Sequence, residues 1–192
     1  MKSSAAKIRA FIAISLPEKI RKKIYLLSEN IPHECAKVKW VNPENIHLTL
    51  VFLGEISEDT LQKVKIKCEA ATKRHSKFKI FIQNSGVFPD IKKPRILWVG
   101  VASELQKPLV SLASDIRRSV DFLSLKDRKG FTPHITFGRI KKIYNQSKLE
   151  KGIQSISIKT ALFPVKEVTI FKSTLKPDGP IYTPLFVIPL KS

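Results

Sequence analysis

Two short segments of the chain carry the same pair of side chains that can bind a phosphate and transfer protons. His47 and Thr49 lie in NIHLTL, and His134 and Thr136 lie in PHITFG, with an apolar residue after each of the four. Side chains alternate between the two faces of a β-strand. A strand at each segment therefore presents the imidazole and the hydroxyl on one face and buries the apolar residues on the other.

Two such strands facing each other would suit a single phosphate. Threonine hydroxyls can donate hydrogen bonds to phosphate oxygens, and an imidazole gives up or accepts a proton near neutral pH. A lone histidine on a strand is more often a structural one. This chain has only four histidines, however, and two share the pattern, whereas His33 and His75 do not and are assigned incidental roles. The doubled pattern predicts paired acid–base catalysis.

The residues around the two motifs offer few metal ligands. Two-metal phosphodiesterases need clustered carboxylates, and Glu44 is the only acidic residue beside either motif. A zinc site needs three or four histidine or cysteine ligands, and the two cysteines, Cys35 and Cys68, are far apart in the sequence. We expect no metal and no other cofactor.

The charge of the chain points to a polyanionic partner. Its 192 residues include 35 Lys and Arg against 16 Asp and Glu, a formal net charge of +19. Such an excess favours nucleic acid, although lysines placed for solubility are the alternative. Two isolated cysteines favour a reducing compartment, although a Cys35–Cys68 disulfide stays open. The apolar run 10–16 is too short to span a bilayer, so we expect a cytoplasmic protein that does not associate with membranes.

The hydrophobic pattern predicts an α+β chain whose second half repeats the order of elements in the first. Helices are expected at 17–30, 57–75 and 103–122, with a short helix within 141–155. The expected strands are 9–16, 46–53 (ended by Gly54), 78–83, 96–101, 134–140, 165–173 and 182–189, the last two joined by the turn KPDGP.

Five blocks of the sequence resemble a known family. RAFIAISLP, WVNPENIHLTLVFLGE, PRILWVG, FTPHITFGRI and FKSTLKPDGPIYTPL together span nearly the whole chain. They resemble the 2H phosphoesterases, and most closely the RNA 2',3'-cyclic phosphodiesterases, also called 2'-5' RNA ligases. The resemblance implies that residues 1–192 form a single 2H phosphoesterase domain. Its α+β fold would be bilobal, with two interleaved, pseudo-symmetric lobes that each carry an antiparallel sheet, flanking helices and one His-x-Thr motif beside a central cleft.

The resemblance also implies an activity. The family hydrolyses the 2',3'-cyclic phosphate at an RNA 3' end to a 2'-phosphate without a metal. His47 would donate a proton to the leaving 3' oxygen, His134 would accept a proton from water, and Thr49 and Thr136 would hold the phosphate. The sequence alone does not show which histidine takes which role.

The expected partner is RNA that ends in a 2',3'-cyclic phosphate, with tRNA fragments as one candidate source, and the protein is expected to be a monomer. Two alternatives stay open. One is 2'-5' RNA ligation in the cell, and the other is an RNA-binding module that does no chemistry.

Other residues have weaker claims to a role in the site. By resemblance, Arg139 could contact the phosphate or ribose. Strict strand alternation puts it on the side of Ile135 and Phe137, however, so it reaches the site only if the strand ends or bulges, and a rim ion pair is the alternative. Several further residues could take part: Lys126, Arg128 and Lys129 as guides for the RNA backbone or as solvated charge, Trp40, Phe88 and Tyr182 as base-stacking or core aromatics, and Ser173 as a polar group lining the site.

Overall fold

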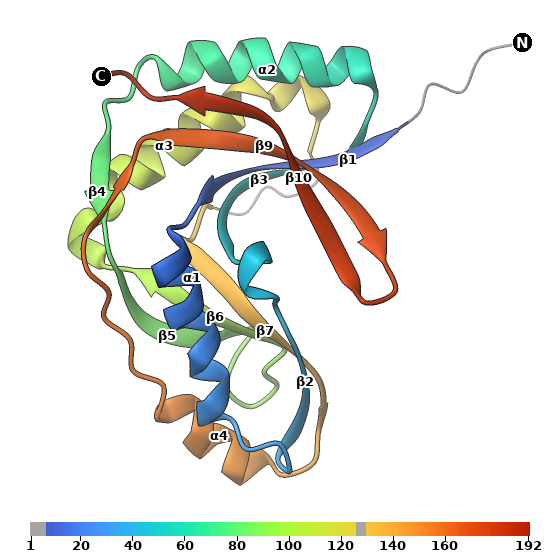
Figure 1. Ribbon diagram of the computed structural model, residues 1–192, viewed down its shortest axis with the longest axis vertical. Helices are drawn as coiled ribbons and strands as arrows, with labels where there is room; N and C mark the ends of the chain where they lie inside the picture. The colour runs from blue at the N-terminus through green and yellow to red at the C-terminus, as the bar shows by residue number, and fades with distance from the viewer. Residues whose placement is uncertain (1–6, 126–129) are drawn as a thin grey trace, which may run out of the picture.

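Two four-stranded antiparallel sheets, each containing strands from both halves of the sequence, form the framework of the protein (Figure 1). The computed structural model describes residues 7–125 and 130–192. The first sheet has the order β10-β9-β1-β3, with β1 (Ile8–Ser15), β3 (His47–Ile56), β9 (Glu167–Lys176) and β10 (Gly179–Pro189). The second has the order β2-β7-β6-β5, with β2 (Ala36–Trp40), β5 (Ile82–Phe88), β6 (Ile96–Val101) and β7 (His134–Ile143). A separate short pair joins β4 (Phe78–Ile80) to β8 (Phe163–Val165).

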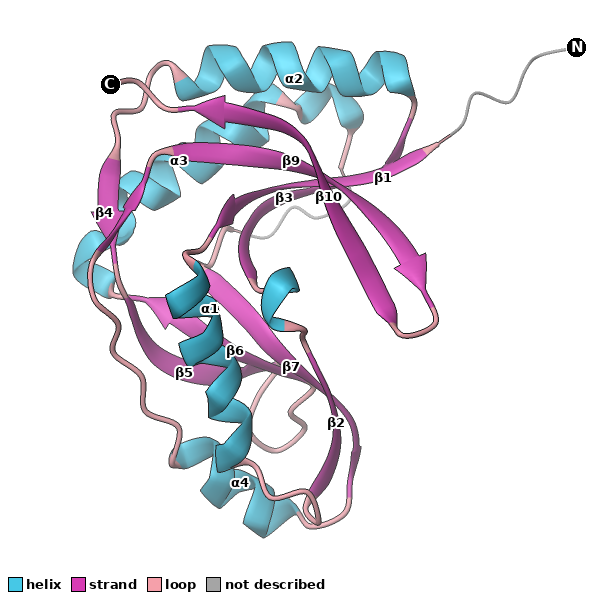
Figure 2. Ribbon diagram, viewed as in Figure 1, coloured by secondary structure: helices cyan, strands magenta, loops and turns pink. Residues whose placement is uncertain are grey.

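The helices lie in two groups, one at the level of each sheet (Figure 2). The long helices α2 (Glu58–Thr72) and α3 (Gln106–Ser119) contact each other, and they contact β9, β10 and β3 of the first sheet. The shorter helices α1 (Glu18–Tyr25) and α4 (Gln146–Gln154) lie at the level of the second sheet. Single 3-10 turns occur at Leu26–Asn30, Pro43–Asn45, Ser103–Leu105 and Asp121–Leu123.

Helix ends and buried faces follow from the local sequence. The Ser57 hydroxyl accepts a hydrogen bond from the Thr60 backbone N–H at 3.3 Å, which satisfies one free donor at the start of α2. Within that helix Leu61, Val64 and Cys68 recur at helical spacing and are buried. The α+β class and the amphipathic helices predicted from the sequence are confirmed.

The apolar residues of both histidine motifs enter one continuous hydrophobic core. Leu48 and Ile135, which follow the two histidines, are fully buried, and Leu50 and Phe137 are nearly so. The histidines and threonines themselves are only partly buried. The motifs therefore anchor their strands through one face and leave the other face available for chemistry.

The predicted strands differ from the observed ones in several details. Gly54 does not end its strand, because it takes a φ of +73° at an irregularity in the pairing with β1, and β3 continues to Ile56. The predicted strand 78–83 divides at Phe81 into β4 and the start of β5, which pair with different partners. Strand β2 was missed because its alternating lysines and apolar residues belong to an edge strand only five residues long.

Two further features bear on the sequence-based expectations. Within the described ranges, no helix is both long and apolar enough to cross a membrane. Cys35 and Cys68 are both buried and unpaired, so the possible disulfide does not form.

Candidate active site

A cavity of about 880 Å³ lies against both sheets and the β9–β10 hairpin, and both histidine motifs line it. His47 and Thr49 reach it from β3 of the first sheet, and His134 and Thr136 reach it from β7 of the second. The structure thus brings together two His–Thr pairs that lie almost half the chain apart in the sequence.

Both histidines are oriented by the backbone two residues before them. Nδ1 of His47 donates to the carbonyl of Asn45 at 2.6 Å, and Nδ1 of His134 donates to the carbonyl of Thr132 at 2.8 Å. Because a carbonyl oxygen only accepts, the proton of each neutral imidazole resides on Nδ1. Nε2 of each ring is then the atom able to exchange a proton with a bound molecule.

Thr49 lies next to the reactive nitrogen of His47. Its hydroxyl oxygen is 2.9 Å from His47 Nε2, and with the ring proton on Nδ1 the hydroxyl is the donor. A phosphate oxygen bound here would compete for the same hydroxyl proton and would free Nε2.

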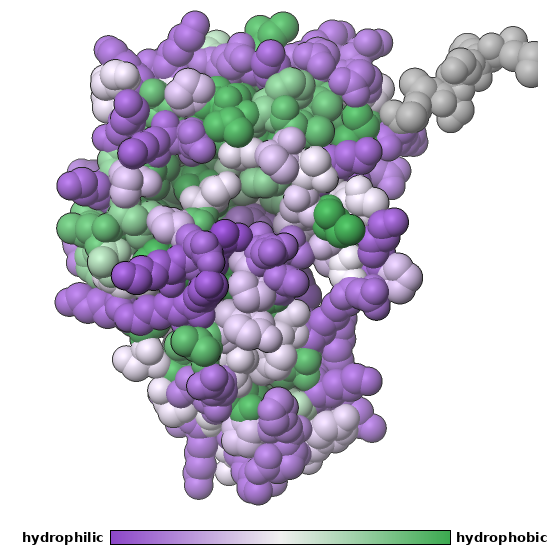
Figure 3. Space-filling view, viewed as in Figure 1, coloured by the Kyte–Doolittle hydropathy of each residue, from purple (hydrophilic) through white to green (hydrophobic). Residues whose placement is uncertain are grey.

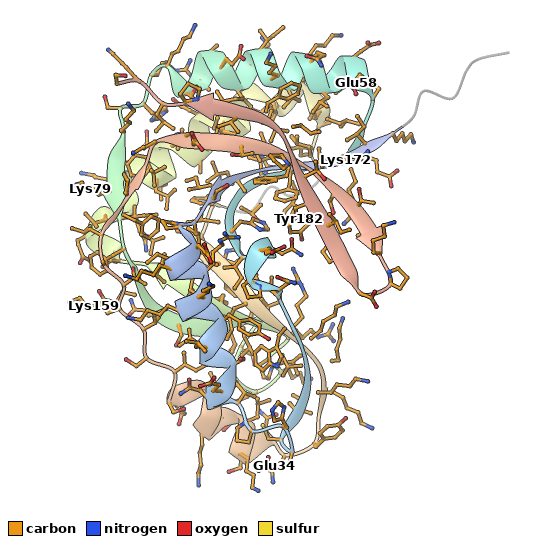
Figure 4. All side chains as sticks on the ribbon, viewed as in Figure 1. Glu34, Glu58, Lys79, Lys159, Lys172 and Tyr182 are labelled. Carbon is orange, nitrogen blue, oxygen red and sulfur yellow. The ribbon has the colours of Figure 1, made fainter. Side chains whose placement is uncertain are left out.

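The two imidazoles have different surroundings. His47 packs against Phe11 at 4.8 Å between ring centroids. It also forms a T-shaped pair with Tyr182 at 5.2 Å, and Figure 4 labels Tyr182 near the middle of the molecule. Burial lowers the pKa of His47 from its ordinary value of 6.5 to about 4, and the charge of Arg139 acts in the same direction. His134 has one such neighbour, Phe88, edge-on at 5.2 Å.

A β-bulge follows each motif at the same position. Thr49 pairs with Ala13 and Val51 with Ile12, so Leu50 is an extra residue in β3. In β7, Thr136 pairs with Trp98 and Gly138 with Leu97, so Phe137 is the extra residue. An extra residue reverses the alternation of side chains beyond it.

The two bulges return the fifth residue after each histidine to the cavity. That residue is Phe52 in β3 and Arg139 in β7, and both line the cavity. The condition under which Arg139 could reach the site is therefore met. Phe52 was not predicted as a cavity residue, because strict alternation assigns it to the buried face of the strand. In the structure its side chain is 64% exposed.

Only some of the aromatic and polar residues suggested from the sequence line the cavity. Trp40 and Tyr182 line the cavity, whereas Phe88 stacks on Trp98 beneath His134. Ser173 pairs with Tyr182 in the hairpin and is not among the cavity-lining residues. Lys126, Arg128 and Lys129 lie outside the described residues.

Asn45 was missed as a residue that connects His47 to the hairpin. Its backbone carbonyl accepts the bond from His47, and its side-chain amide donates to the carbonyl of Pro180 at 2.7 Å. Pro180 is the second residue of β10, just after the turn at residues 177–178, and it lines the cavity together with Lys176 and Pro177. The separation of 135 positions between donor and acceptor left no local signal in the sequence.

Possible metal ligands are scattered. In the part of the chain that the structure describes, no three side chains of histidine, cysteine, aspartate or glutamate come together in a group that could hold a metal ion.

Comparison with known proteins places these features in a family. The sequence model described as LigT like Phosphoesterase matches the chain twice, over residues 14–98 and 99–182. A protein of Methanothermobacter thermautotrophicus named RNA 2',3'-cyclic phosphodiesterase is 32% identical over 189 residues, covering 96% of this chain and all of the relative. One of the same name from Methanocaldococcus jannaschii is 32% identical over 91% of this chain and 96% of the relative.

Solved structures of similar fold include members of the same family. The crystal structure of E. coli LigT complexed with 3'-AMP superposes with a TM-score of 0.75 at 25% identity, covering 98% of this chain and 100% of that one. The two successive matches to the family model agree with the repeated order of elements predicted from the sequence.

Proposed function

The chain belongs to the LigT-like phosphoesterase family of the 2H superfamily, and we propose that it hydrolyses the 2',3'-cyclic phosphate at an RNA 3' end to a 2'-phosphate, without a metal ion. The observation that carries the proposal is the convergence of two imidazole Nε2 atoms and two threonine hydroxyls on one cavity. The name shared by the relatives supports the substrate class. We further propose that residues 1–192 act as one catalytic domain.

In the proposed mechanism the cyclic phosphate binds between the two motifs. Thr49 and Thr136 donate hydrogen bonds to its non-bridging oxygens, and the guanidinium of Arg139 offsets the negative charge. Water attacks phosphorus opposite the 3' oxygen. His134 Nε2 takes the proton of the water as the new P–O bond forms. His47 Nε2 gives a proton to the 3' oxygen as that P–O bond breaks, which leaves the 2'-phosphate.

The lowered pKa of His47 bears directly on this assignment. A proton donor must be an imidazolium ion when the bond breaks, and burial holds the free His47 in its neutral form. Taken alone, this would favour His47 as the base. A phosphate anion beside Nε2 stabilises the imidazolium, however, and a Thr49 hydroxyl that turns toward a phosphate oxygen no longer donates to Nε2. The proposed donor role therefore requires that substrate binding raise the pKa of His47.

The test is hydrolysis of a short RNA ending in a 2',3'-cyclic phosphate, in the presence of EDTA, with chromatography against 2'- and 3'-phosphate standards. We expect a 2'-phosphate product and a loss of at least about 100-fold in kcat/KM for His47→Ala and for His134→Ala. His33→Ala is the matched control because His33 is exposed and is not among the cavity-lining residues. Full activity in both catalytic variants, or activity only after metal is restored, rules the proposal out.

The same assay reports on the neighbouring possibilities. An added oligonucleotide with a free 5' hydroxyl would be joined through a 2'-5' linkage if that hydroxyl replaced water as the nucleophile. We place the enzyme in the cytoplasm as a monomer, acting on RNA fragments such as those of tRNA. Light scattering on the purified protein checks the monomer, and cell fractionation checks the location.

A further inference from the structure

Four cationic side chains line the cavity beside the two motifs. Lys39 comes from β2, Arg139 and Lys141 from β7, and Lys176 from the hairpin tip. Among the described residues that line the cavity, Asp178 is the only carboxylate. The cavity is therefore strongly cationic well beyond the positions of the two histidines.

No described residue neutralises these cations. Within residues 7–125 and 130–192, none of the four forms an ion pair, and none donates a side-chain hydrogen bond. Lys39 also lies directly opposite Arg139 in the β2–β7 ladder, and Lys37 lies opposite Lys142. Like charges directly opposite each other destabilise a strand pair. A bound polyanion would remove that repulsion.

One terminal phosphate does not account for all four charges. Arg139 follows Thr136 by only three residues and lines the cavity beyond the Phe137 bulge, so we assign it to the subsite between the motifs. Lys141 follows Thr136 by five residues, which is roughly 16 Å of extended strand before the bulge shortens it. The cavity of about 880 Å³ is correspondingly much larger than a phosphate group.

We propose that Lys39, Lys141 and Lys176 form a subsite for the phosphodiester backbone of the RNA strand that precedes the cyclic phosphate. The inference rests on the proposed function and adds a specificity to it: the enzyme prefers an oligonucleotide end over a mononucleotide 2',3'-cyclic phosphate. Lysines suit this role because contacts to backbone phosphates add affinity without selecting a base sequence.

The position of the hairpin supports a strand path on this side. The hairpin end of β9 and β10 extends below β1 on the right of Figure 1, and Lys176 is the last residue of β9 at that end. Hydrophilic side chains dominate the right-hand edge of the face below the hairpin in Figure 3. The Asn45–Pro180 hydrogen bond ties the start of β10 to the segment before His47. The strand would leave the site between the hairpin tip and the β2 edge.

The experiment compares adenosine 2',3'-cyclic phosphate with a tetranucleotide that ends in the same group. The site variant combines Lys39→Gln, Lys141→Gln and Lys176→Gln. The control variant combines Lys63→Gln, Lys67→Gln and Lys79→Gln, which removes the same charge from exposed lysines of α2 and β4. Figure 4 shows Lys79 on the opposite side of the molecule from the hairpin.

We expect the wild type and the control variant to favour the tetranucleotide by at least about 10-fold in kcat/KM, and the site variant to lose that preference. Hydrolysis of the mononucleotide should stay within about twofold in all three proteins. Equal preference in the site and control variants overturns the subsite and leaves the proposed hydrolysis standing.

A binding arm separates failure of the subsite from failure of the proposed function. If neither substrate is hydrolysed, the proposed function fails, and affinity for the tetranucleotide 2'-phosphate at increasing salt still tests the subsite. Each single-strand phosphate contact contributes about 0.7 to the slope of log affinity against log salt. The site variant should lower that slope by about 2, and a slope unchanged from the control variant overturns the inference.

Discussion

At the scale of single residues, the two histidines share one hydrogen-bonding arrangement but differ in burial. Each donates through Nδ1 to the carbonyl two residues earlier, so each presents Nε2 to the cavity. Only His47 is enclosed by aromatic rings, and burial lowers its pKa to about 4. Two histidines of the same motif can act as acid and base only if their surroundings differ.

Leaving-group chemistry should separate the two roles. An aryl phosphodiester with a p-nitrophenolate leaving group needs no proton donor. We therefore expect His47→Ala to lose at least about 100-fold in kcat/KM on the RNA cyclic phosphate and less than about 10-fold on the aryl ester. His134→Ala should lose comparable activity on both substrates, because both need an activated water.

Paired steady-state assays on these two substrates make the measurement, with His33→Ala as the unaffected control. If instead His134→Ala is the variant rescued by the aryl ester, the roles of the two histidines are reversed.

The titration of His47 should be visible by NMR. Its imidazole is expected to protonate near pH 4 in the free protein, and inorganic phosphate should move that midpoint upward. A midpoint that phosphate leaves unchanged contradicts the donor role.

The same shift predicts a pH-dependent stability. The unfolded chain binds the His47 proton near pH 6.5 and the folded chain binds it only near 4, so the free energy of unfolding falls as pH falls through this window. The full effect is on the order of 3 kcal/mol. Denaturant titrations at several pH values should show this slope in the wild type, reduced in His47→Gln; identical slopes in the two proteins contradict the shift.

At the scale of elements, the sequence predicted the strands that carry the motifs but not how they bend. Alternation correctly assigned Leu48 and Ile135 to the core, because burial decides one face of a strand. It failed beyond Leu50 and Phe137, since a bulge depends on pairing with a strand distant in sequence. Phe52 was therefore missed as a cavity residue.

Asn45 joins two elements, and its side chain can be removed without touching the bond to His47. Asn45→Ala keeps the backbone carbonyl that orients the imidazole but loses the bond from its amide to Pro180. We expect a drop of about 5- to 50-fold in kcat/KM, because the hairpin is less firmly placed over the site. Asn45→Asp, whose carboxylate cannot donate to the carbonyl, should behave like Asn45→Ala.

Kinetics on the RNA cyclic phosphate, with Asn42→Ala as a neighbouring control, test this coupling. Asn42 caps the 3-10 turn through Glu44 N–H and makes no bond to the hairpin. Equal effects of the Asn45 and Asn42 changes would show that the turn matters and the hairpin bond does not.

At the scale of the whole molecule, each sheet combines strands from both halves of the chain, and the first sheet joins its two ends. The first sheet joins β1 and β3 to β9 and β10, and this long-range pairing of strands brings Tyr182 beside His47. The repeated order of elements predicted pseudo-symmetry, but periodicity could not show which strands pair across such distances. The cleft was predicted from the family resemblance. The hydrogen bond from Asn45 to Pro180 and the cluster of Lys39, Lys141 and Lys176 could not be predicted, because they join residues that are distant in the sequence.

A polar cluster remote from the cavity offers a test of stability without chemistry. Asp115 of α3 accepts a hydrogen bond from Arg118 and one from His75 at 2.9 Å, beyond the end of α2. The Arg118 bond, followed by the His75 bond, lowers the pKa of Asp115 to about 2. The carboxylate thus stabilises the fold above its unfolded pKa near 3.8, and this contribution is lost as pH falls through about 2.

We expect Asp115→Asn to lower the free energy of unfolding by about 1 to 3 kcal/mol at pH 7 and to leave kcat/KM unchanged. Urea denaturation with the exposed Glu167→Gln as control provides the measurement. A lower kcat/KM in folded Asp115→Asn would contradict this expectation and would show that the cluster affects the active site.

The central claim is most directly tested by a single-turnover reaction of an RNA 2',3'-cyclic phosphate in ¹⁸O-labelled water with EDTA present. The account predicts one ¹⁸O atom in the 2'-phosphate product, full rate without metal, and loss of the reaction in both His47→Ala and His134→Ala. A 3'-phosphate product, dependence on added metal, or turnover that survives removal of either imidazole would contradict it.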